Sequence, residues 1–122
     1  MHMKWMQKGF AYFRKGWYFM KRLTECEELV MSVIWDSNVS MNLPQIVRKV
    51  NARYGKTWAT QTVSTFLVRL RRKNVIKAER DGRTFFYEVL VTKQEYTAMV
   101  ARNVLNLWFD GDIDKMVKAV SD

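Results

Sequence analysis

The sequence predicts a mostly α-helical fold with one small β-hairpin, and three observations lead to this prediction. The chain has 122 residues, of which 48% are hydrophobic, so it has the length of one domain and enough apolar residues for a core. Apolar residues recur at helical spacing in several segments, two of which begin with a capping box. Asp81-Gly82 separates two β-prone runs, as a hairpin turn does.

The first two predicted helices are recognised by how they begin and end. In the helix over residues 24–37, Thr24 and Glu27 form a capping box, in which each side chain satisfies a free backbone N–H. Asn42 can cap the second helix, and Gly55 is suited to end it. The apolar faces are Cys26, Leu29, Val30, Val33 and Ile34 in the first helix and Leu43, Ile46, Val47 and Val50 in the second.

A third predicted helix covers residues 60–73 and has two distinct faces. The apolar face should pack against the core and consists of Val63, Phe66, Leu67 and Leu70. The opposite face begins with short polar side chains, which are Gln61, Thr62, Ser64 and Thr65. Asn74 is suited to the left-handed conformation that follows many helices.

The hairpin follows this helix directly. Strands are expected over residues 75–80 and 84–90, which are rich in β-branched and aromatic side chains. They are joined through Asp81-Gly82, a pair that favours a type I′ turn.

Two more helices are predicted after the hairpin. Thr92 and Glu95 make a second capping box for a helix that runs to about Phe109, and Asp112 can cap a short last helix. Their apolar faces are too broad for a small domain to cover, so we expect residues 92–122 to form a helical dimerisation region. The predicted interface residues are Tyr96, Met99, Val100, Val104, Leu107, Trp108, Ile113, Met116 and Val117.

The charge of the chain is large and unevenly distributed. With 21 Lys and Arg against 12 Asp and Glu, the net charge is +9, which predicts a polyanionic partner. Residues 48–83 hold eleven basic and two acidic residues. Residues 1–22 form a basic and aromatic N-terminal extension with six basic residues and no acidic one. This extension could be a membrane-surface anchor, an arm that adds to nucleic-acid binding, or an appendage without a specific function.

The order of helix, helix, helix and hairpin predicts a winged helix-turn-helix DNA-binding domain over residues 23–91. A recognition helix needs short hydrogen-bonding side chains in its first turns, where they meet the base edges. The candidate base-reading residues are therefore Gln61, Thr62, Ser64 and Thr65. The candidate contacts to phosphates and from the hairpin, or wing, are Arg69, Arg71, Arg72, Lys73, Arg80 and Arg83.

The residue types present argue against catalysis and against a bound cofactor. His2 is the only histidine and Cys26 the only cysteine, so one chain can build neither a His-based nucleophile system nor a His/Cys zinc site. A single cysteine also excludes an internal disulfide framework. No uncharged apolar stretch approaches the roughly 18 residues of a membrane span. We therefore expect a non-enzymatic, cytoplasmic protein that has no catalytic residues, no metal and no cofactor.

Three segments of the chain carry a family resemblance: LTECEELVMSVIW at 23–35, WATQTVSTFLVRL at 58–70, and GRTFFY at 82–87, the last followed by Glu95-Tyr96. Over about residues 22–110 the chain resembles the penicillinase-repressor (BlaI/MecI/CopY) family. The resemblance implies a homodimeric bacterial transcriptional repressor whose winged helix binds a palindromic, double-stranded DNA operator. It also implies that the four candidate base-reading residues occupy the base-reading positions of the family.

The resemblance further suggests how repression ends. In the β-lactam branch of the family a protease cuts the dimerisation helix at an Asn–Phe bond. Asn103 and Val104 stand at the matching place, so they are a candidate cleavage site for a regulatory protease. The copper branch carries paired CxC metal ligands, which this sequence lacks, so copper sensing is not expected.

Two other functions are compatible with the charge pattern. The hairpin and the basic face could form a protein-interaction module that binds an acidic partner. The N-terminal extension could instead hold the protein at a membrane surface.

Overall fold

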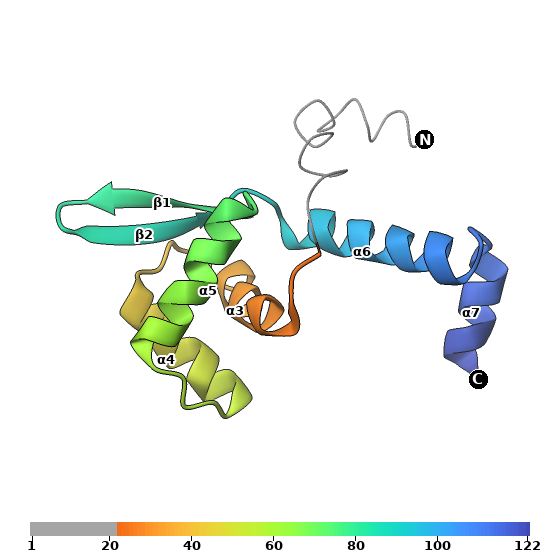
Figure 1. Cartoon of the computed structure of the whole chain (residues 1–122), viewed down its shortest axis with the longest axis horizontal. Helices are drawn as coiled ribbons and strands as arrows, with labels where there is room; N and C mark the ends of the chain where they lie inside the picture. Colours follow the sequence, from red (N-terminus) through yellow and green to blue (C-terminus); the bar gives the residue numbers. More distant parts are fainter. Residues whose placement is uncertain (1–21) are drawn as a thin grey trace. The chain divides into compact units, whose positions relative to one another are not determined.

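The computed structural model describes residues 22–122, so the predicted extension lies, apart from Arg22, outside the described residues. The described part contains five helices and a two-stranded sheet, drawn in Figure 1. It divides between Val91 and Thr92 into two compact units. The first unit contains three helices followed by the hairpin, which confirms the predicted winged helix-turn-helix order, and the second contains the last two helices.

Helix α3 (Glu25–Trp35) begins with the predicted capping box. The hydroxyl of Thr24 accepts a hydrogen bond from the backbone N–H of Glu27, and the carboxylate of Glu27 accepts one from the N–H of Thr24. These bonds satisfy two backbone donors that a helix start leaves free, which explains why the helix begins here.

Helix α4 (Leu43–Tyr54) is bounded in the same local way. Asn42 and Gln45 exchange hydrogen bonds between side chain and backbone, with N–O distances of 3.0 and 2.9 Å. Gly55 follows the helix with a φ of 62°, a left-handed conformation that glycine adopts without a clash from a Cβ atom.

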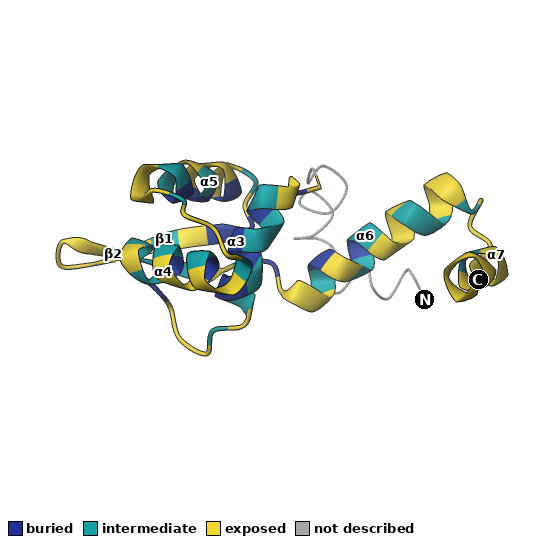
Figure 2. Cartoon of the chain, turned by 90° about the horizontal axis from the view of Figure 1, so that it is seen from below, coloured by how far each residue is buried: buried dark blue, intermediate teal, exposed yellow. Residues whose placement is uncertain are grey.

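Helix α5 (Thr60–Arg72) completes a three-helix core. The inward faces of α3, α4 and α5 carry most of the buried residues of the first unit, as Figure 2 shows. The core residues on these helices are Val30, Met31, Val33, Ile34, Ile46, Val50, Val63, Leu67 and Leu70. Their spacing of three and four residues in each helix is the reason that one face of each helix is buried.

The two strands of the hairpin, β1 (Ile76–Asp81) and β2 (Thr84–Val89), pair antiparallel, with the last residue of β1 opposite the first of β2. The central residues of the turn are therefore Gly82 and Arg83, and not Asp81 and Gly82 as predicted. Gly82 has a φ of 67°, whereas Arg83 does not have a positive φ. A type I′ turn needs positive φ at both central residues, and a type II′ turn only at the first. The type I′ prediction is wrong because the register puts a non-glycine residue at the second central position.

Two further contacts attach the hairpin to the helices. The backbone N–H of Tyr87 donates to the carbonyl of Met41 at 2.9 Å, so the loop between α3 and α4 pairs with β2. The indole N–H of Trp35 donates to the carbonyl of Val91 at 2.9 Å, just after the hairpin. The inner part of β2 and the residues that follow it are thus connected to the helical part of the first unit, whereas the tip of the hairpin is not part of these contacts.

The second unit consists of α6 (Lys93–Trp108) and α7 (Ile113–Ser121). The predicted capping box of Thr92 and Glu95 is present at the start of α6. The carboxylate of Asp112 accepts hydrogen bonds from the first turn of α7, as expected for an N-cap.

Candidate nucleic-acid interface

The outward face of α5 carries the side chains predicted to read bases. Gln61 and Thr65 are exposed one turn apart on this face, and Thr62 and Ser64 are half-buried beside them. The hydroxyl of Thr65 donates to the carbonyl of Gln61 at 3.0 Å, which fixes its orientation and leaves its oxygen able to accept a hydrogen bond. Val68 continues the same face and is 39% exposed. Because Val68 follows Thr65 by three residues on a helix, the sequence could have identified it as an apolar contact on the same face.

The start of α5 is held in place by its neighbours. The side-chain amide of Asn51 on α4 donates to the carbonyl of Trp58 and accepts from its N–H, both at 3.0 Å. The ring of Trp58 lies against that of Phe66, with centroids 5.1 Å apart. Phe66 is half-buried, so the prediction that it belongs to the core is only partly right. It supports α5 against the preceding loop, while Leu67 beside it is fully buried.

The approach to α5 holds a cation that sequence reasoning missed. The ammonium of Lys56 lies 5.7 Å from the ring centroid of Trp58. Ala59, which comes directly after Trp58, is the N-cap of α5, and its side chain makes no capping hydrogen bond. The first backbone N–H groups of α5 are therefore not satisfied by a cap. The signal that could have found Lys56 is its position shortly before a helix that presents a polar face.

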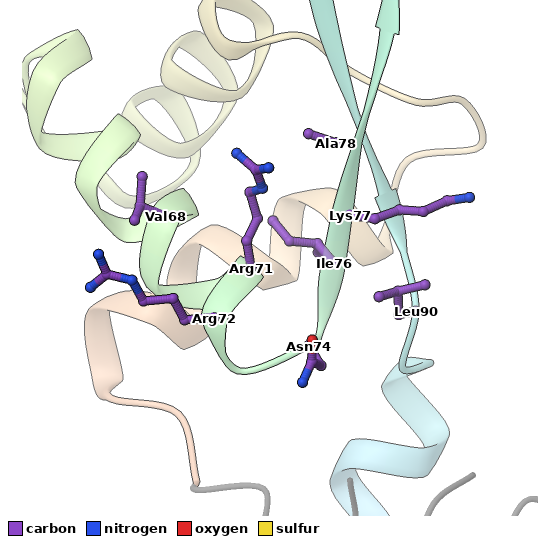
Figure 3. A pocket seen from close by; sticks show the side chains of 8 residues that line it. All are labelled: Val68, Arg71, Arg72, Asn74, Ile76, Lys77, Ala78 and Leu90. Carbon is purple, nitrogen blue, oxygen red and sulfur yellow. The ribbon is translucent and has the colours of Figure 1, made fainter.

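The last turns of α5 form an arginine cluster, which we define as Arg69, Arg71 and Arg72. All three side chains are exposed, and no ion pair is formed by any of them within residues 22–122. A shallow pocket lies between the end of α5 and β1 (Figure 3). Arg71 reaches into the space between these two elements, whereas Arg72 and Lys77 point away from it in opposite directions. Arg71 and Arg72 therefore present their guanidinium groups in different directions from the end of α5.

Two lysines within residues 48–83 form ion pairs with carboxylates of the chain. Lys73, predicted to bind phosphate, places its Nζ 2.5 Å from the Oε1 atom of Glu27, a carboxylate that is only 1% exposed. On the hairpin, the Nζ atom of Lys77 lies 3.5 Å from the Oε2 atom of Glu79 and 3.5 Å from the Oε1 atom of Glu88. The negative charge of Glu79, followed by that of Glu88, raises the pKa of Lys77 above its ordinary value. Neither lysine is as available to an external anion as the arginine cluster is.

The tip of the hairpin carries two arginines in different environments. The Nε–H of Arg80 donates to the carbonyl of Gly82 at 2.9 Å, and its guanidinium lies 5.5 Å from the ring centroid of Phe85. Arg83 is exposed and takes part in no ion pair or ring contact among the described residues. One arginine of the tip is thus held and the other is not.

Helix α4 adds basic residues that the sequence prediction did not single out. Arg48 and Lys49 are exposed in the middle of this helix. Arg53, near its end, is paired with Asp36 at 2.8 Å and is therefore engaged within the chain. In the sequence, the only sign that Arg48 and Lys49 belong to this basic surface is their location on the helix that precedes α5.

In the second unit, the predicted interface residues divide by exposure. Tyr96 and Met99 are buried in the single chain, so they have little surface to offer a second copy. Val100, Val104 and Met116 are half-buried. The exposed members are Leu107, Trp108, Ile113 and Val117, and Val120, which the sequence places on the same apolar stripe of the last helix, is exposed too. Asn103, of the candidate cleavage site, is exposed and donates to the sulfur of Met99.

Residues 22–122 contain no cluster of three or more His, Cys, Asp or Glu side chains that could hold a metal ion. None of the helices in the same range has the length and apolar character needed to cross a membrane.

Solved structures similar to this one include DNA-binding domains. The solution structure of the DNA-binding domain of the repressor BlaI matches with a TM-score of 0.55 and 27% identity, over 63% of this chain and 90% of that one. The monomeric form of Bacillus licheniformis BlaI in complex with the blaP half-operator matches with a TM-score of 0.52 and 26% identity, over the same shares.

Sequence relatives point in the same direction. The penicillinase repressor of Bacillus licheniformis is 27% identical over 96 residues, which are 79% of this chain and 73% of that protein. The methicillin resistance regulatory protein MecI of Staphylococcus aureus strain N315 is 24% identical over 95 residues, 78% of this chain and 75% of that one. The family model described as penicillinase repressor matches residues 23–122. The chain therefore belongs to the penicillinase repressor family.

Proposed function

We propose that this protein is a transcriptional repressor that binds a palindromic DNA operator as a homodimer. The observation that carries the proposal is the outward face of α5, where exposed Gln61 and Thr65 are followed by the arginine cluster. A helix of this kind fits the major groove, with its first turns at the base edges and its last turns near the backbone. This function needs neither catalysis nor a cofactor, in agreement with a family of repressors.

The base-reading role falls to the start of α5. Gln61 can form paired hydrogen bonds with the N6 and N7 edge of adenine, and Thr65 can contact a thymine methyl group or accept a hydrogen bond. Thr62 and Ser64, which are less exposed, flank these two side chains. Val68 adds an apolar contact that would favour a thymine methyl group.

The phosphate-binding role falls to basic side chains that the fold leaves exposed. Support comes from the arginine cluster and from Arg83, none of which forms an ion pair within the described part. Lys56, Arg48 and Lys49 extend this basic surface toward the start of α5 and along α4. Lys73 is given a structural role instead, because its ammonium is bound to Glu27.

The homodimer is supported by apolar surface on the second unit. Leu107 and Trp108 are each 71% exposed at the end of α6, and Ile113, Val117 and Val120 form an exposed stripe on α7. Several large apolar side chains exposed on neighbouring helices are typical of an interface. A twofold dimer would also match a palindromic operator, because each subunit would read one half-site.

Release of repression by a regulatory protease would act on the same unit. Asn103 is exposed, and Val104 is half-buried in the C-terminal half of α6. Proteases bind extended backbone, so cleavage between these residues would require α6 to open locally first. Cleavage there would separate the exposed apolar residues from the DNA-binding domain and weaken operator binding.

A selection experiment tests the proposed function. Purified protein is used to select duplexes from a pool with a randomised centre, and the enriched duplex is then titrated against a scrambled version. We expect enrichment of a dyad-symmetric sequence and much tighter binding to it than to the scrambled duplex at a fixed salt concentration. The matched control carries Gln61→Ala and Thr65→Ala, and its preference for the selected duplex over the scrambled one should be much smaller. Equal binding of both duplexes by the unmodified protein would contradict the proposal.

A further inference from the structure

The tip of the hairpin contains an arginine that is held in one orientation before any partner binds. Arg80 lies directly opposite Phe85 in the strand register, on the same face of the hairpin. Its guanidinium is 5.5 Å from the ring centroid, and its Nε–H donates to the carbonyl of Gly82 at 2.9 Å. Phe85 itself is 46% exposed, so the ring is at the surface and the arginine covers part of it.

This arrangement prepares Arg80 for a narrow, negatively charged site. The ring removes water from the guanidinium and limits its rotation, while the Gly82 carbonyl uses only the Nε donor. The two terminal nitrogens keep their N–H groups for an external acceptor. Because the side chain is already ordered, it loses less conformational entropy on binding than a free arginine would.

Arg83 provides a contrast within the same turn. It is one of the two central residues of the turn and has no ring or carboxylate partner within residues 22–122. An exposed cation without such contacts suits a phosphate, which accepts hydrogen bonds from many directions and carries no sequence information. The two arginines of the tip therefore have different chemistry available to them.

We propose that Arg80, positioned by Phe85, enters the minor groove of DNA next to the segment read by α5 and senses its width. Narrow minor grooves occur in A·T-rich DNA, where the negative potential is enhanced and attracts arginine. The proposal rests on the proposed function and adds to it a preference for A·T-rich flanks. Phe85 is a positioning residue in this scheme, because it acts through the orientation of Arg80.

Operator duplexes with altered flanks test this proposal directly. The central segment of the duplex, which α5 reads, is kept constant, and each flank is built from A·T, G·C or inosine·cytosine pairs. Inosine·cytosine lacks the minor-groove N2 amino group of guanine but keeps the major-groove acceptors of G·C. We expect A·T and inosine·cytosine flanks to be bound similarly and about tenfold more tightly than G·C flanks. This pattern is expected only if the flank is read from the minor groove.

Substitutions at the tip distinguish positioning from charge. Arg80→Ala and Phe85→Leu should both abolish the flank preference, although Phe85→Leu leaves every charge in place. Phe85→Tyr should keep the flank preference of the unmodified protein, because it retains an aromatic ring under the guanidinium. Arg83→Ala is the matched control and should weaken binding to all three flanks by the same factor.

The outcomes separate this inference from the function on which it rests. If the unmodified protein binds the constant centre but treats all flanks alike, the minor-groove role is overturned and the repressor function stands. The same conclusion follows if Phe85→Leu keeps the full preference, or if Arg80→Ala weakens all flanks equally, as a phosphate contact would. If the protein does not distinguish the constant centre from a scrambled one, both proposals fail.

Discussion

Lys73 at the end of α5 forms an ion pair with Glu27 at the start of α3, with 2.5 Å between Nζ and Oε1. The same oxygen of Glu27 also accepts a hydrogen bond from the backbone N–H of Thr24. One buried carboxylate therefore caps the first helix of the domain and anchors the last turn of the helix proposed to read DNA. This explains why a charged residue that is only 1% exposed is tolerated in the core.

The ion pair leads to a prediction about stability. Lys73→Met should lower the free energy of unfolding by about 3 kcal/mol, because it leaves a buried carboxylate without its cation. Glu27→Gln with Lys73→Met should recover part of the loss, since glutamine can still act in the capping box. Urea denaturation of the wild type, the two single variants and the double variant measures the coupling. Additive effects of the two substitutions would contradict the predicted interaction.

The base-reading face of α5 can be tested without disturbing the fold. Gln61→Ala and Thr65→Ala should each reduce discrimination at particular operator positions by about 1–3 kcal/mol. They should leave thermal stability nearly unchanged because both side chains are exposed. Titration against duplexes with single base-pair changes checks this expectation. A Gln61→Ala variant with wild-type discrimination at every position would refute the base-reading role of Gln61.

The exposed and the paired cations near the pocket should differ in their effect on DNA binding. Arg71→Ala should weaken binding to all sequences and reduce the slope of log K against log salt by about one unit. Lys77→Ala is a matched control that lines the same pocket, and it should change the slope less because Glu79 and Glu88 already pair with Lys77. Equal changes in slope for the two variants would show that pairing with Glu79 and Glu88 does not keep Lys77 from binding phosphates.

Two adjacent residues of α5 should respond differently to truncation. Leu67→Ala removes a fully buried side chain and should cost about 3 kcal/mol of unfolding free energy. Phe66→Ala should cost about 2 kcal/mol, below the range for a fully buried phenylalanine, because its ring is half-buried against Trp58. Chemical denaturation gives both values. A larger cost for Phe66→Ala than for Leu67→Ala would mean that the contact with Trp58 is worth more than core burial at this site.

The exposed apolar residues of the second unit predict a dimer that charge can disrupt. Leu107→Asp combined with Trp108→Asp should give a folded monomer with much weaker binding to a palindromic operator, because the substitutions place charges in the proposed interface. Tyr96→Phe, at a buried position of the same helix, is the control and should leave the dimer intact. Analytical ultracentrifugation measures the assembly state. A monomer for the unmodified chain over the concentrations at which it binds DNA would contradict the interface.

The local elements of this protein follow from its sequence. Capping pairs such as Thr24 with Glu27 and Thr92 with Glu95 connect residues three apart, so short-range patterns are enough to place the helix starts. The left-handed residue Asn74, with a φ of 60°, was predicted for the same reason. The polar and apolar faces of α5 also follow from helical spacing, which is why the face proposed to read bases could be named in advance.

The availability of each charged side chain depends instead on contacts between distant segments. Lys73 and Glu27 are 46 residues apart in the sequence, and only the packing of α5 against α3 brings them together. The strand register likewise determines that Gly82 and Arg83 form the turn and that Phe85 lies opposite Arg80. A basic residue in the sequence indicates a charge but not its partner, because the electrostatic environment is set by residues that the fold brings near. The tertiary structure therefore separates the cations engaged within the chain from those left exposed, which are the ones proposed to bind DNA.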